Sequence, residues 1–294
     1  MFSPPFVWLQ KRPAVPELEF SGEIAGGELA GAGFSDSELS REERALGLEM
    51  ALSQTLRFPR RQGILPKPES LSHTEAAALP IATILPYWSL VSAGGLKMGG
   101  NQRVFIIAAA FGAHVVSTCS PTSLELVTSL GANETIDYRT VSVPEHLSND
   151  FSGEKAFDVI FDCVGTNELY TACPTFLKPD GLYAVIGAPA GGFGQFFRFG
   201  KQMATNLALP GWLGGTPRRW EFIQVPSDKW GATFESCLEL IKQGKVKPVI
   251  DQVHTIEEAM KGYERVLSGR YVPHVILFER DLALIWLTTG RKER

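Results

Sequence analysis

Two short stretches that follow apolar runs hold the residues best placed for chemistry. Asp162-Cys163-Val164-Gly165 follows AFDVIF, and Gly187-Ala188 follows LYAVI. Both runs are typical of buried strands, and a doubly wound parallel sheet binds ligands where the carboxyl ends of its strands meet. Glycine at such an end lets the backbone approach a flat ring closely. The pattern predicts ligand contacts at Cys163, Val164, Gly165, Gly187 and Ala188, although Gly165 and Gly187 could instead only end their strands.

A third apolar run, HVVSTC at residues 114–119, ends in hydroxyl side chains. In dinucleotide-binding sheets the end of this strand meets the adenosine ribose, and an acidic residue there selects NAD by binding both ribose hydroxyls. No acidic residue is present here, and Ser117, Thr118 and Ser120 supply hydroxyls instead. Ser117 and Ser120 are therefore candidate cofactor contacts, and the pattern favours NADP over NAD.

The connection before that run is unusually short. Only six residues, AAAFGA, separate it from RVFII at 103–107, which also reads as a buried strand. Neighbouring parallel strands need a crossover of about a dozen residues, usually a helix. An alternative is that residues 100–113 form one short buried helix ended by Gly112, in which case the first strand does not form.

Longer segments resemble the zinc-free quinone-oxidoreductase branch of the medium-chain dehydrogenase/reductase superfamily, close to the reticulon-interacting mitochondrial oxidoreductases and enoyl-reductase-type domains. The resemblance implies an NADPH-dependent enzyme that transfers hydride to a quinone, enone or enoyl C=C without zinc. It also places Tyr138, beside Arg139 in IDYR, near the cofactor 2′-phosphate, whereas the residues alone equally allow a strand-end aromatic. The segments that carry the resemblance are Lys11–Ile24, Leu65–Ile106, Ala108–Arg139, Ala156–Gly165, Leu177–Pro189 and Arg218–Gly269.

Three departures from the family pattern leave enzymatic activity uncertain. Family members carry a glycine-rich turn and half a helix between the equivalents of Ile106 and Ile107, and such a turn holds the cofactor pyrophosphate. Leu85 stands where the family has a threonine, and Pro273-His274 stand where it has Gly-Lys. These departures favour a second hypothesis, in which the chain is a catalytically inactive remnant or interaction module without a working phosphate site.

The fold class expected is α/β: a doubly wound, Rossmann-like parallel sheet without its glycine-rich first crossover, with fragments of a GroES-like β-rich domain. The predicted domains are an incomplete GroES-like catalytic domain with a poorly ordered insertion at 1–90, a dinucleotide-binding domain at 91–244, and a C-terminal return to the catalytic domain with a tail at 245–294. Within the first, residues 25–63 are expected to be disordered or to form a docked helix after the cap signal Asp36-Ser37-Glu38. In the tail, LALIWL is expected to be a short packed or sticky terminal segment.

The composition and net charge limit the classes of molecule that the chain could bind. The chain has 294 residues, is 44% apolar and 20% charged, and has a net charge of −4, which suits one or two globular domains. It has no basic stripe for nucleic acid, and no apolar run reaches the ~20 residues that span a membrane. We therefore expect a small-molecule substrate, no nucleic acid and no membrane. A cytoplasmic location is expected, with a mitochondrial one also open, and a homodimer could form through Leu209–Gly215.

A metal centre is not expected from the sequence. The histidines and cysteines do not occur at the spacing of zinc ligands. The cysteines lie mostly in apolar segments and read as reduced core residues. The residues concerned are His73, His114, His146, His254 and His274, and Cys119, Cys163, Cys173 and Cys237.

Overall fold

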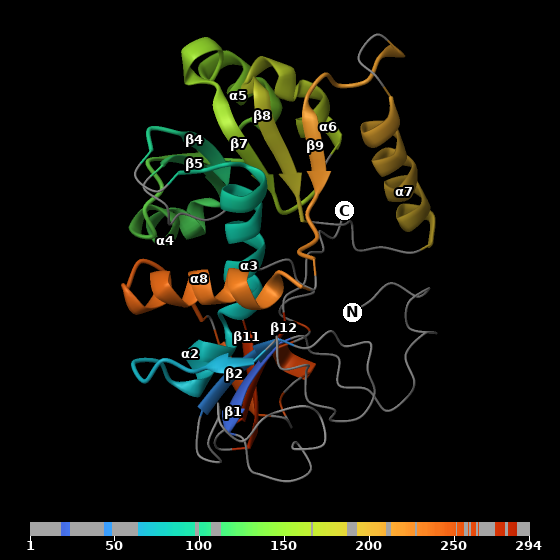
Figure 1. Cartoon of the computed structure of the whole chain (residues 1–294). Coiled ribbons are helices and arrows are strands. Elements are labelled where there is room, and N and C mark those ends of the chain that lie inside the picture. The colour runs from blue at the N-terminus through green and yellow to red at the C-terminus, as the bar shows by residue number, and fades with distance from the viewer. Residues whose placement is uncertain are drawn as a thin grey trace. The chain divides into compact units, whose positions relative to one another are not determined.

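The chain forms two compact units in this computed structural model (Figure 1). The first unit comprises residues 1–84 and 225–294, and the second comprises residues 85–224. No helix among the described residues is long and apolar enough to cross a membrane. The structure describes residues 19–23, 44–48, 64–97, 100–106, 113–165, 167–186, 193–209, 213–226, 228–250, 252–255, 258, 260–262, 264, 274–279 and 282–286.

The second unit is built on a six-stranded sheet in the order β6-β5-β4-β7-β8-β9, and every neighbouring pair is parallel. From β4 the chain winds outward through β5 to β6, and then from β7 through β8 to β9. The winding therefore reverses between β4 and β7, which confirms the doubly wound, Rossmann-like sheet expected from the sequence. The strands are β4 (Arg103–Ile106), β5 (His114–Cys119), β6 (Glu134–Asp137), β7 (Phe157–Asp162), β8 (Leu177–Val185) and β9 (Arg219–Phe222).

One face of this sheet carries the main hydrophobic core. Fully buried aromatic rings dominate it, because apolar side chains alternate with the pleat and meet the helices that cover this face. Phe157, for example, stacks on Phe151 with ring centroids 5.2 Å apart. The helices that contribute core residues are α5 (Val143–Asp150), α6 (Asn167–Ala172) and the 3₁₀ turn η6 (Cys173–Thr175).

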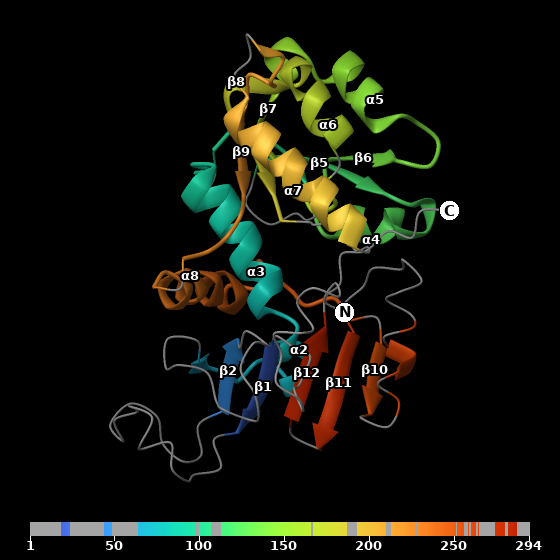
Figure 2. The same cartoon turned by 90° about the vertical axis from the view of Figure 1, so that its right-hand side faces the viewer.

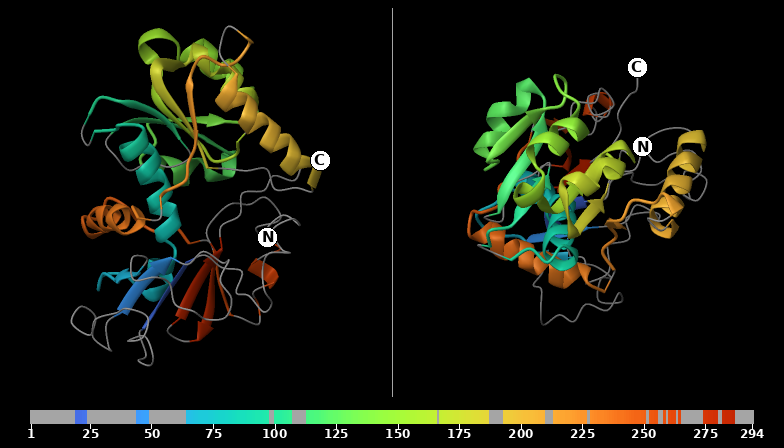
Figure 3. Two further views of the ribbon diagram at one scale, coloured as in Figure 1. Left: turned by 45° about the vertical axis from the view of Figure 1, so that its right-hand side comes forward. Right: turned by 90° about the horizontal axis from the view of Figure 1, so that it is seen from above.

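The other segments of the second unit are short or peripheral. Residues Pro121–Ser123 form the 3₁₀ turn η4 directly before α4 (Leu124–Ser129), and Gly153–Lys155 form the turn η5 before β7. Helix α7 (Phe193–Ala208) lies beside β9, and both views of Figure 3 show it at the periphery of the unit.

Strand β4 forms as the apolar pattern predicts, so the alternative of a single buried helix is wrong for residues 103–106. β4 pairs with β5 in parallel, with Arg103 opposite His114. Seven residues, 107–113, connect the two strands. A return along four strand residues covers about 13 Å, whereas seven residues in a helix rise about 10 Å. The connection is therefore too short for two turns and a crossover helix.

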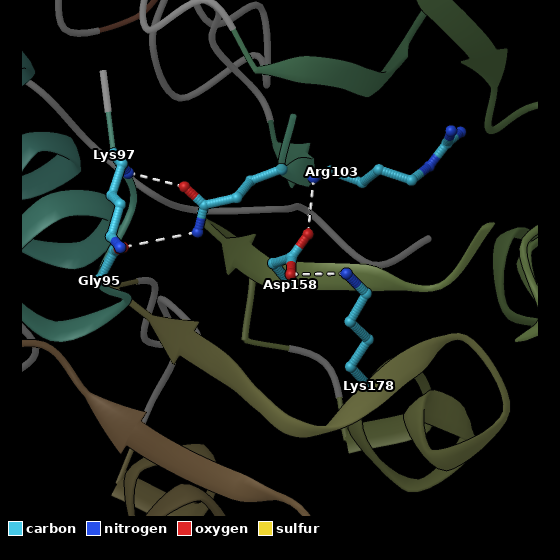
Figure 4. A network of polar contacts seen from close by, with 6 residues as sticks. Gly95, Lys97, Arg103, Asp158 and Lys178 are labelled. Carbon is cyan, nitrogen blue, oxygen red and sulfur yellow. Dashed lines mark hydrogen bonds and ion pairs between the residues drawn. The ribbon is translucent and has the colours of Figure 1, made fainter. Parts of the chain in front are cut away.

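Side chains at the amino ends of the strands hold β4 in place (Figure 4). The Asp158 carboxylate accepts a hydrogen bond from the Arg103 backbone N–H at 2.7 Å and pairs with the Lys178 ammonium at 2.7 Å. Gln102 adds a second anchor, because its Oε1 accepts from the Lys97 backbone N–H at 2.6 Å. On the other side of β4, His114 Nε2 lies 2.8 Å from Glu134 Oε1.

The helix that enters the second unit changes its pitch around a proline. α3 (Pro80–Tyr87) contains Pro86 and continues directly as a π-helical segment, η3 (Trp88–Ala93). Proline lacks the N–H that would bond the carbonyl four residues before it. Close to it, Ser89 Oγ donates to the Leu85 carbonyl at 2.7 Å where the pitch widens. The segment therefore begins as an α-helix and ends in a π-helix.

The first unit contains a second sheet, in the order β10-β11-β12-β1-β2-β3 (Figure 2). β10 and β11 are parallel and all the other pairs are antiparallel. Helix α2 (His73–Ala77) begins at a capping box between Ser72 and Glu75, and α8 (Trp230–Lys242) is the long helix of this unit. The strands are β1 (Glu19–Glu23), β2 (Arg44–Leu48), β3 (Ile64–Pro66), β10 (Gln252–Thr255), β11 (His274–Glu279) and β12 (Leu282–Trp286).

Two sequence expectations need correction in this unit. The helix or disorder expected across residues 25–63 is wrong for Arg44–Leu48, which forms β2 and pairs with β1 over five residues. The apolar run in the tail, expected to be a short packed or sticky terminal segment, is a strand of the sheet, because Leu282–Trp286 forms β12 between β11 and β1. In both places pairing with a neighbouring strand overrides the local pattern. The rest of residues 25–63 lies outside the described part of the chain, and the predicted domain boundaries at 90 and 244 stay predictions.

Gly94 is required by lack of space, and this can be tested. It caps η3 with an ordinary φ of −83°, but a Cβ built there would lie 2.8 Å from both the Leu90 carbonyl oxygen and Val159 Cγ2. We expect Gly94→Ala to lower the free energy of unfolding in urea by about 1–3 kcal/mol. The control is Gly200→Ala in α7, whose new Cβ meets nothing within 4 Å. Equal effects of the two variants would contradict the argument.

Candidate cofactor site

Asp162, the last residue of β7, organises the turn at the carboxyl edge of the sheet. Its Oδ1 accepts hydrogen bonds from the backbone N–H groups of Val164 at 2.7 Å and Gly165 at 2.9 Å. Gly165 has a φ of +75°, which favours glycine at this position. The side chain of Asp162 is buried, so these bonds fix the turn that follows β7. Residues Cys163, Val164 and Gly165 thus lie together beside the point where the winding of the sheet reverses.

Tyr183 of β8 completes the environment of this carboxylate. Its hydroxyl donates to Asp162 Oδ2 at 2.8 Å, and its buried ring meets Tyr170 edge-on with centroids 5.1 Å apart. Burial raises the pKa of Tyr183 well above 10, and the Asp162 charge adds to the shift. Tyr183 therefore stays protonated and acts as a donor. No sequence pattern pointed to this role, because Tyr183 occupies an ordinary core position of a strand.

Cys163 and Val164 differ in exposure within the turn. Val164 is exposed, whereas Cys163 is half-buried. Burial raises the pKa of the Cys163 thiol, and the neighbouring Asp162 carboxylate raises it further. The thiol is consequently a neutral group beside the turn and is poorly suited to act as a nucleophile.

Hydroxyl groups gather at the carboxyl end of β5. The Ser120 hydroxyl lies 2.9 Å from that of Thr122 and 3.2 Å from that of Ser123. β5 and β6 are parallel, with Cys119 opposite Asp137, so the residues that follow them, Ser120 and Tyr138, belong to the same edge. The sequence analysis singled out Ser120 but not Thr122 or Ser123, which the turn after the strand adds to the cluster.

Tyr138 and Arg139 follow β6 at this edge. Tyr138 is 40% exposed, and the guanidinium of Arg139 lies 6.0 Å from the centre of its ring. Asp137 is turned toward its own backbone, because its Oδ1 accepts from the Arg139 N–H at 2.9 Å. An aromatic ring, a cation and several hydroxyls therefore border the ends of β5 and β6, a set of donors that suits a phosphate group.

Ser117 lies deeper than the sequence pattern indicates. It sits inside β5 rather than at its end and is only 1% exposed. Its Oγ has no hydrogen-bond partner among the described residues. The structure therefore separates Ser117 from the Ser120 cluster, with Thr118 and Cys119 between them.

Other positions named from the sequence fall outside the described residues or belong to other elements. Gly187 and Ala188 follow β8 but fall outside the described residues, as do 107–112 after β4. Leu85 belongs to α3, where its carbonyl accepts from Ser89 Oγ, and His274 begins β11 of the other unit. Within the described part of the chain, no three His, Cys, Asp or Glu side chains group to hold a metal ion. Zinc independence remains a prediction.

A parallel doubly wound sheet with polar groups and a glycine turn at its carboxyl edge is the architecture of dinucleotide-binding domains of dehydrogenases. Residues 130–277 match the family model described as zinc-binding dehydrogenase, so the chain belongs to this family, within the medium-chain dehydrogenase/reductase superfamily. The family resemblance drawn from the sequence is thereby confirmed.

Relatives of known name agree with this assignment. The chain is 31% identical over 237 residues to trans-enoyl reductase pgmF of Aspergillus terreus, covering 74% of this chain and 62% of that protein. It is 31% identical over 227 residues to the human mitochondrial NAD(P)H oxidoreductase RTN4IP1, covering 69% of this chain and 55% of that protein. The chain thus spans less than two thirds of the length of these curated relatives.

Known structures share the fold at low sequence identity. The CurK enoyl reductase superposes with a TM-score of 0.66 at 20% identity, covering 88% of this chain and 77% of that one. The quinone oxidoreductase of Coxiella burnetii gives a TM-score of 0.63 at 19% identity, covering 89% and 78%. These likenesses support the fold, including the sheet that carries the candidate site.

The hydrogen bond between Tyr183 and Asp162 can be tested by a one-atom deletion. Tyr183→Phe leaves a buried carboxylate oxygen without its donor, so we expect a loss of about 1–3 kcal/mol in the free energy of unfolding, measured in urea. The control is Tyr170→Phe, because the Tyr170 hydroxyl faces neutral carbonyls, those of Arg218 at 3.1 Å and Thr216 at 3.4 Å. A loss for Tyr183→Phe no larger than for the control would show that this bond does not hold the turn.

The cysteines provide a second test. Burial raises the pKa of Cys173 and of Cys237 from 9.0 to about 12, and also raises those of Cys119 and Cys163. At pH 8 a thiol with a pKa of 12 has about a thousandth of the thiolate of an ordinary one. We expect iodoacetamide to label the native chain very slowly and all four cysteines after unfolding in urea.

The same shifts give the pH dependence of stability. Above pH 9 the unfolded state loses thiol protons that the folded state keeps until about pH 12. The folded state then binds more protons, so the free energy of unfolding should fall as the pH rises through this window. Rapid labelling of any cysteine by iodoacetamide in the native chain would contradict the raised thiol pKa values on which both expectations depend.

Proposed function

We propose that the chain is an NADPH-dependent oxidoreductase that reduces a quinone, enone or enoyl C=C. Support comes from its relatives, which include a trans-enoyl reductase and an NAD(P)H oxidoreductase, and from a mycobacterial structure complexed with NADPH that shares the fold at 14% identity and a TM-score of 0.66. The single observation that carries the choice of NADPH is the cluster of hydroxyls at the end of β5, where no carboxylate ends the strand.

The residues at the carboxyl edge divide into two groups under this proposal. The hydroxyl groups of Ser120, Thr122 and Ser123 act as hydrogen-bond donors to the adenosine 2′-phosphate. Arg139, beside Tyr138, supplies positive charge. At the reversal of winding, the turn Cys163–Gly165 supplies a flat backbone surface for the nicotinamide, together with Gly187 and Ala188. Ser117 lies buried within β5, three residues before Ser120, and supports this edge of the sheet without reaching its end.

The chemistry in such a site depends mainly on position. A bound nicotinamide supplies the hydride. Asp162 positions the turn, because its carboxylate oxygens accept hydrogen bonds from the Val164 and Gly165 N–H groups and from the Tyr183 hydroxyl. The buried Tyr183 hydroxyl is already committed to Asp162, so the proton that accompanies reduction comes from solvent or from a hydroxyl of the substrate pocket.

The pyrophosphate is the part of the cofactor that these residues fit least. The seven residues between β4 and β5 contain one glycine, Gly112, and are too few for a helix whose N-terminus would face the phosphates. This favours a second candidate function, a chain that keeps the fold and has lost the phosphate site, and so acts as an inactive remnant or an interaction module. The two candidates differ in cofactor affinity.

An NADPH titration of the purified chain, followed by cofactor fluorescence and thermal shift, separates the candidates. We expect a dissociation constant in the micromolar range, weaker binding of NADH, and turnover with a quinone or enone. Each charge-assisted bond lost at the pyrophosphate costs about 1.5–3 kcal/mol, so loss of the cradle would move binding to about the millimolar range. No binding at millimolar NADPH would overturn the reductase proposal and support the inactive chain.

The variant Ser120→Asp tests the 2′-phosphate assignment within the same experiment. The new carboxylate should repel the 2′-phosphate and weaken NADPH at least tenfold, while NADH binding stays the same or improves. Ser129→Asp, an exposed serine in α4, is the matched control and should leave both affinities unchanged. Equal effects on NADPH and NADH would place the adenosine end elsewhere.

A further inference from the structure

The second unit has a cavity between α5 and α6, which lie side by side (Figures 1 and 2). α6 begins two residues after the turn Cys163–Gly165 and ends at Ala172, so the cavity lies at the end of α6 that is remote from the candidate cofactor site. Its volume of about 280 Å³ is just below the ~300–1,000 Å³ of pockets for drug-sized ligands, so it suits a smaller group such as one side chain. The lining residues are Pro144, Glu145, Ser148 and Asn149 of α5 and Ala172 of α6.

The polar lining residues share one side of α5. Glu145, Ser148 and Asn149 are spaced at i, i+3 and i+4, which places them on one face of a helix. Leu147 is fully buried in the hydrophobic core, so α5 turns its apolar side to the core and this polar side to the cavity. Pro144 and Ala172 supply the apolar part of the wall.

The hydroxyl groups at the wall have fewer protons than they have contacts. Ser148 Oγ lies 2.7 Å from the Pro144 carbonyl, and Thr175 Oγ1 lies 2.8 Å from the Ala172 carbonyl. The two hydroxyls also lie 2.8 Å from each other. Each hydroxyl has one proton, so two protons serve three contacts, and one oxygen is always left as an acceptor without a donor. An N–H donor from a ligand would meet this need.

The cavity also carries uncompensated negative charge. Glu145 is exposed, and its carboxylate makes no ion pair or hydrogen bond within the described part of the chain. The neighbouring Asp150 is paired, because its Oδ2 lies 2.9 Å from His146 Nδ1. Neither α5 nor α6 contains a lysine or an arginine. A ligand for this cavity should therefore be a cation with several N–H donors.

We propose that the cavity binds the guanidinium group of an arginine side chain that a partner protein supplies. A guanidinium group has its N–H donors in one plane and has no acceptor, so it can bond to Glu145 and to the hydroxyl oxygens at once. Its flat, weakly hydrated faces can lie against the ring of Pro144 and the methyl group of Ala172. A lysine ammonium is compact and strongly hydrated, and would leave most of these acceptors to water.

Titration of the full chain with N-acetyl-arginine amide, followed by the NMR shifts of the backbone amides, tests the proposal. We expect a dissociation constant of about 0.1–10 mM, because a ligand of this size makes few contacts. N-acetyl-citrulline amide has nearly the same shape without the charge, and should bind at least about tenfold more weakly. N-acetyl-lysine amide should also bind more weakly than the arginine amide.

Paired variants test the location of the site. Glu145→Gln removes the charge of an exposed side chain and should weaken binding of the arginine amide by about two- to fivefold. Glu145→Lys reverses the charge and should weaken it by about tenfold or more. The matched controls, Glu168→Gln and Glu168→Lys, change an exposed glutamate of α6 that does not line the cavity, and should alter the affinity by less than about 1.5-fold. Unchanged far-UV circular dichroism would exclude unfolding as the cause.

Four results would overturn the proposal. The first is absence of binding at about 50 mM arginine amide. The second is equal binding of the citrulline or lysine amide, which would show that the cavity does not select a planar cation. The third is an equal effect of the Glu145 and Glu168 variants. The fourth is tighter binding of free arginine than of its amide, which would assign the cavity to a small molecule. NADPH is absent from these titrations, so their outcome is independent of the proposed reductase function.

Discussion

Strand β4 hydrogen-bonds to β5 on one side and to β7 on the other, and so joins the two halves of the parallel sheet. The carboxyl edge of the second unit depends on this pairing, because the reversal of winding lies between β4 and β7. In related folds a crossover helix adds packing beside the first strand. Here the pairing rests on the flanking strands and on polar anchors at the opposite edge. Asp158 supplies the main anchor, since it binds both the Arg103 backbone and Lys178.

This arrangement separates what holds the fold from what binds a cofactor. The anchors of β4 lie at the amino ends of the strands, whereas ligands bind at the carboxyl ends. The sheet can therefore keep its order of strands although the connection between β4 and β5 is short. At the carboxyl edge, the end of β5 carries a cluster of hydroxyls and the end of β7 carries a turn with one glycine, Gly165.

Much of the second unit could be predicted from the sequence. Short apolar runs gave the strands around β4, β5 and β7 because buried parallel strands are nearly continuous in apolar residues. The grouping of Cys163, Val164 and Gly165 followed from their position after such a run. Tyr183 could not be predicted, since its partner Asp162 lies on the neighbouring strand and only the register brings them together. In the first unit, β2 and β12 were missed for the same reason: five-residue segments become strands when a neighbour supplies the ladder.

The fit of a dinucleotide to this edge depends on which end of the cofactor dominates binding. In the proposed function, the hydroxyls and the cation at the ends of β5 and β6 meet the adenosine end of the cofactor, where selectivity between NADPH and NADH arises. The pyrophosphate normally contributes more, because its charges meet several backbone N–H groups and a helix N-terminus at once. A chain that keeps the first set and lacks the second can therefore remain selective while it loses affinity. Selectivity and affinity are then separate measures, and a preference for NADPH that survives at weak affinity would support the assignment of the adenosine end to the edge of β5.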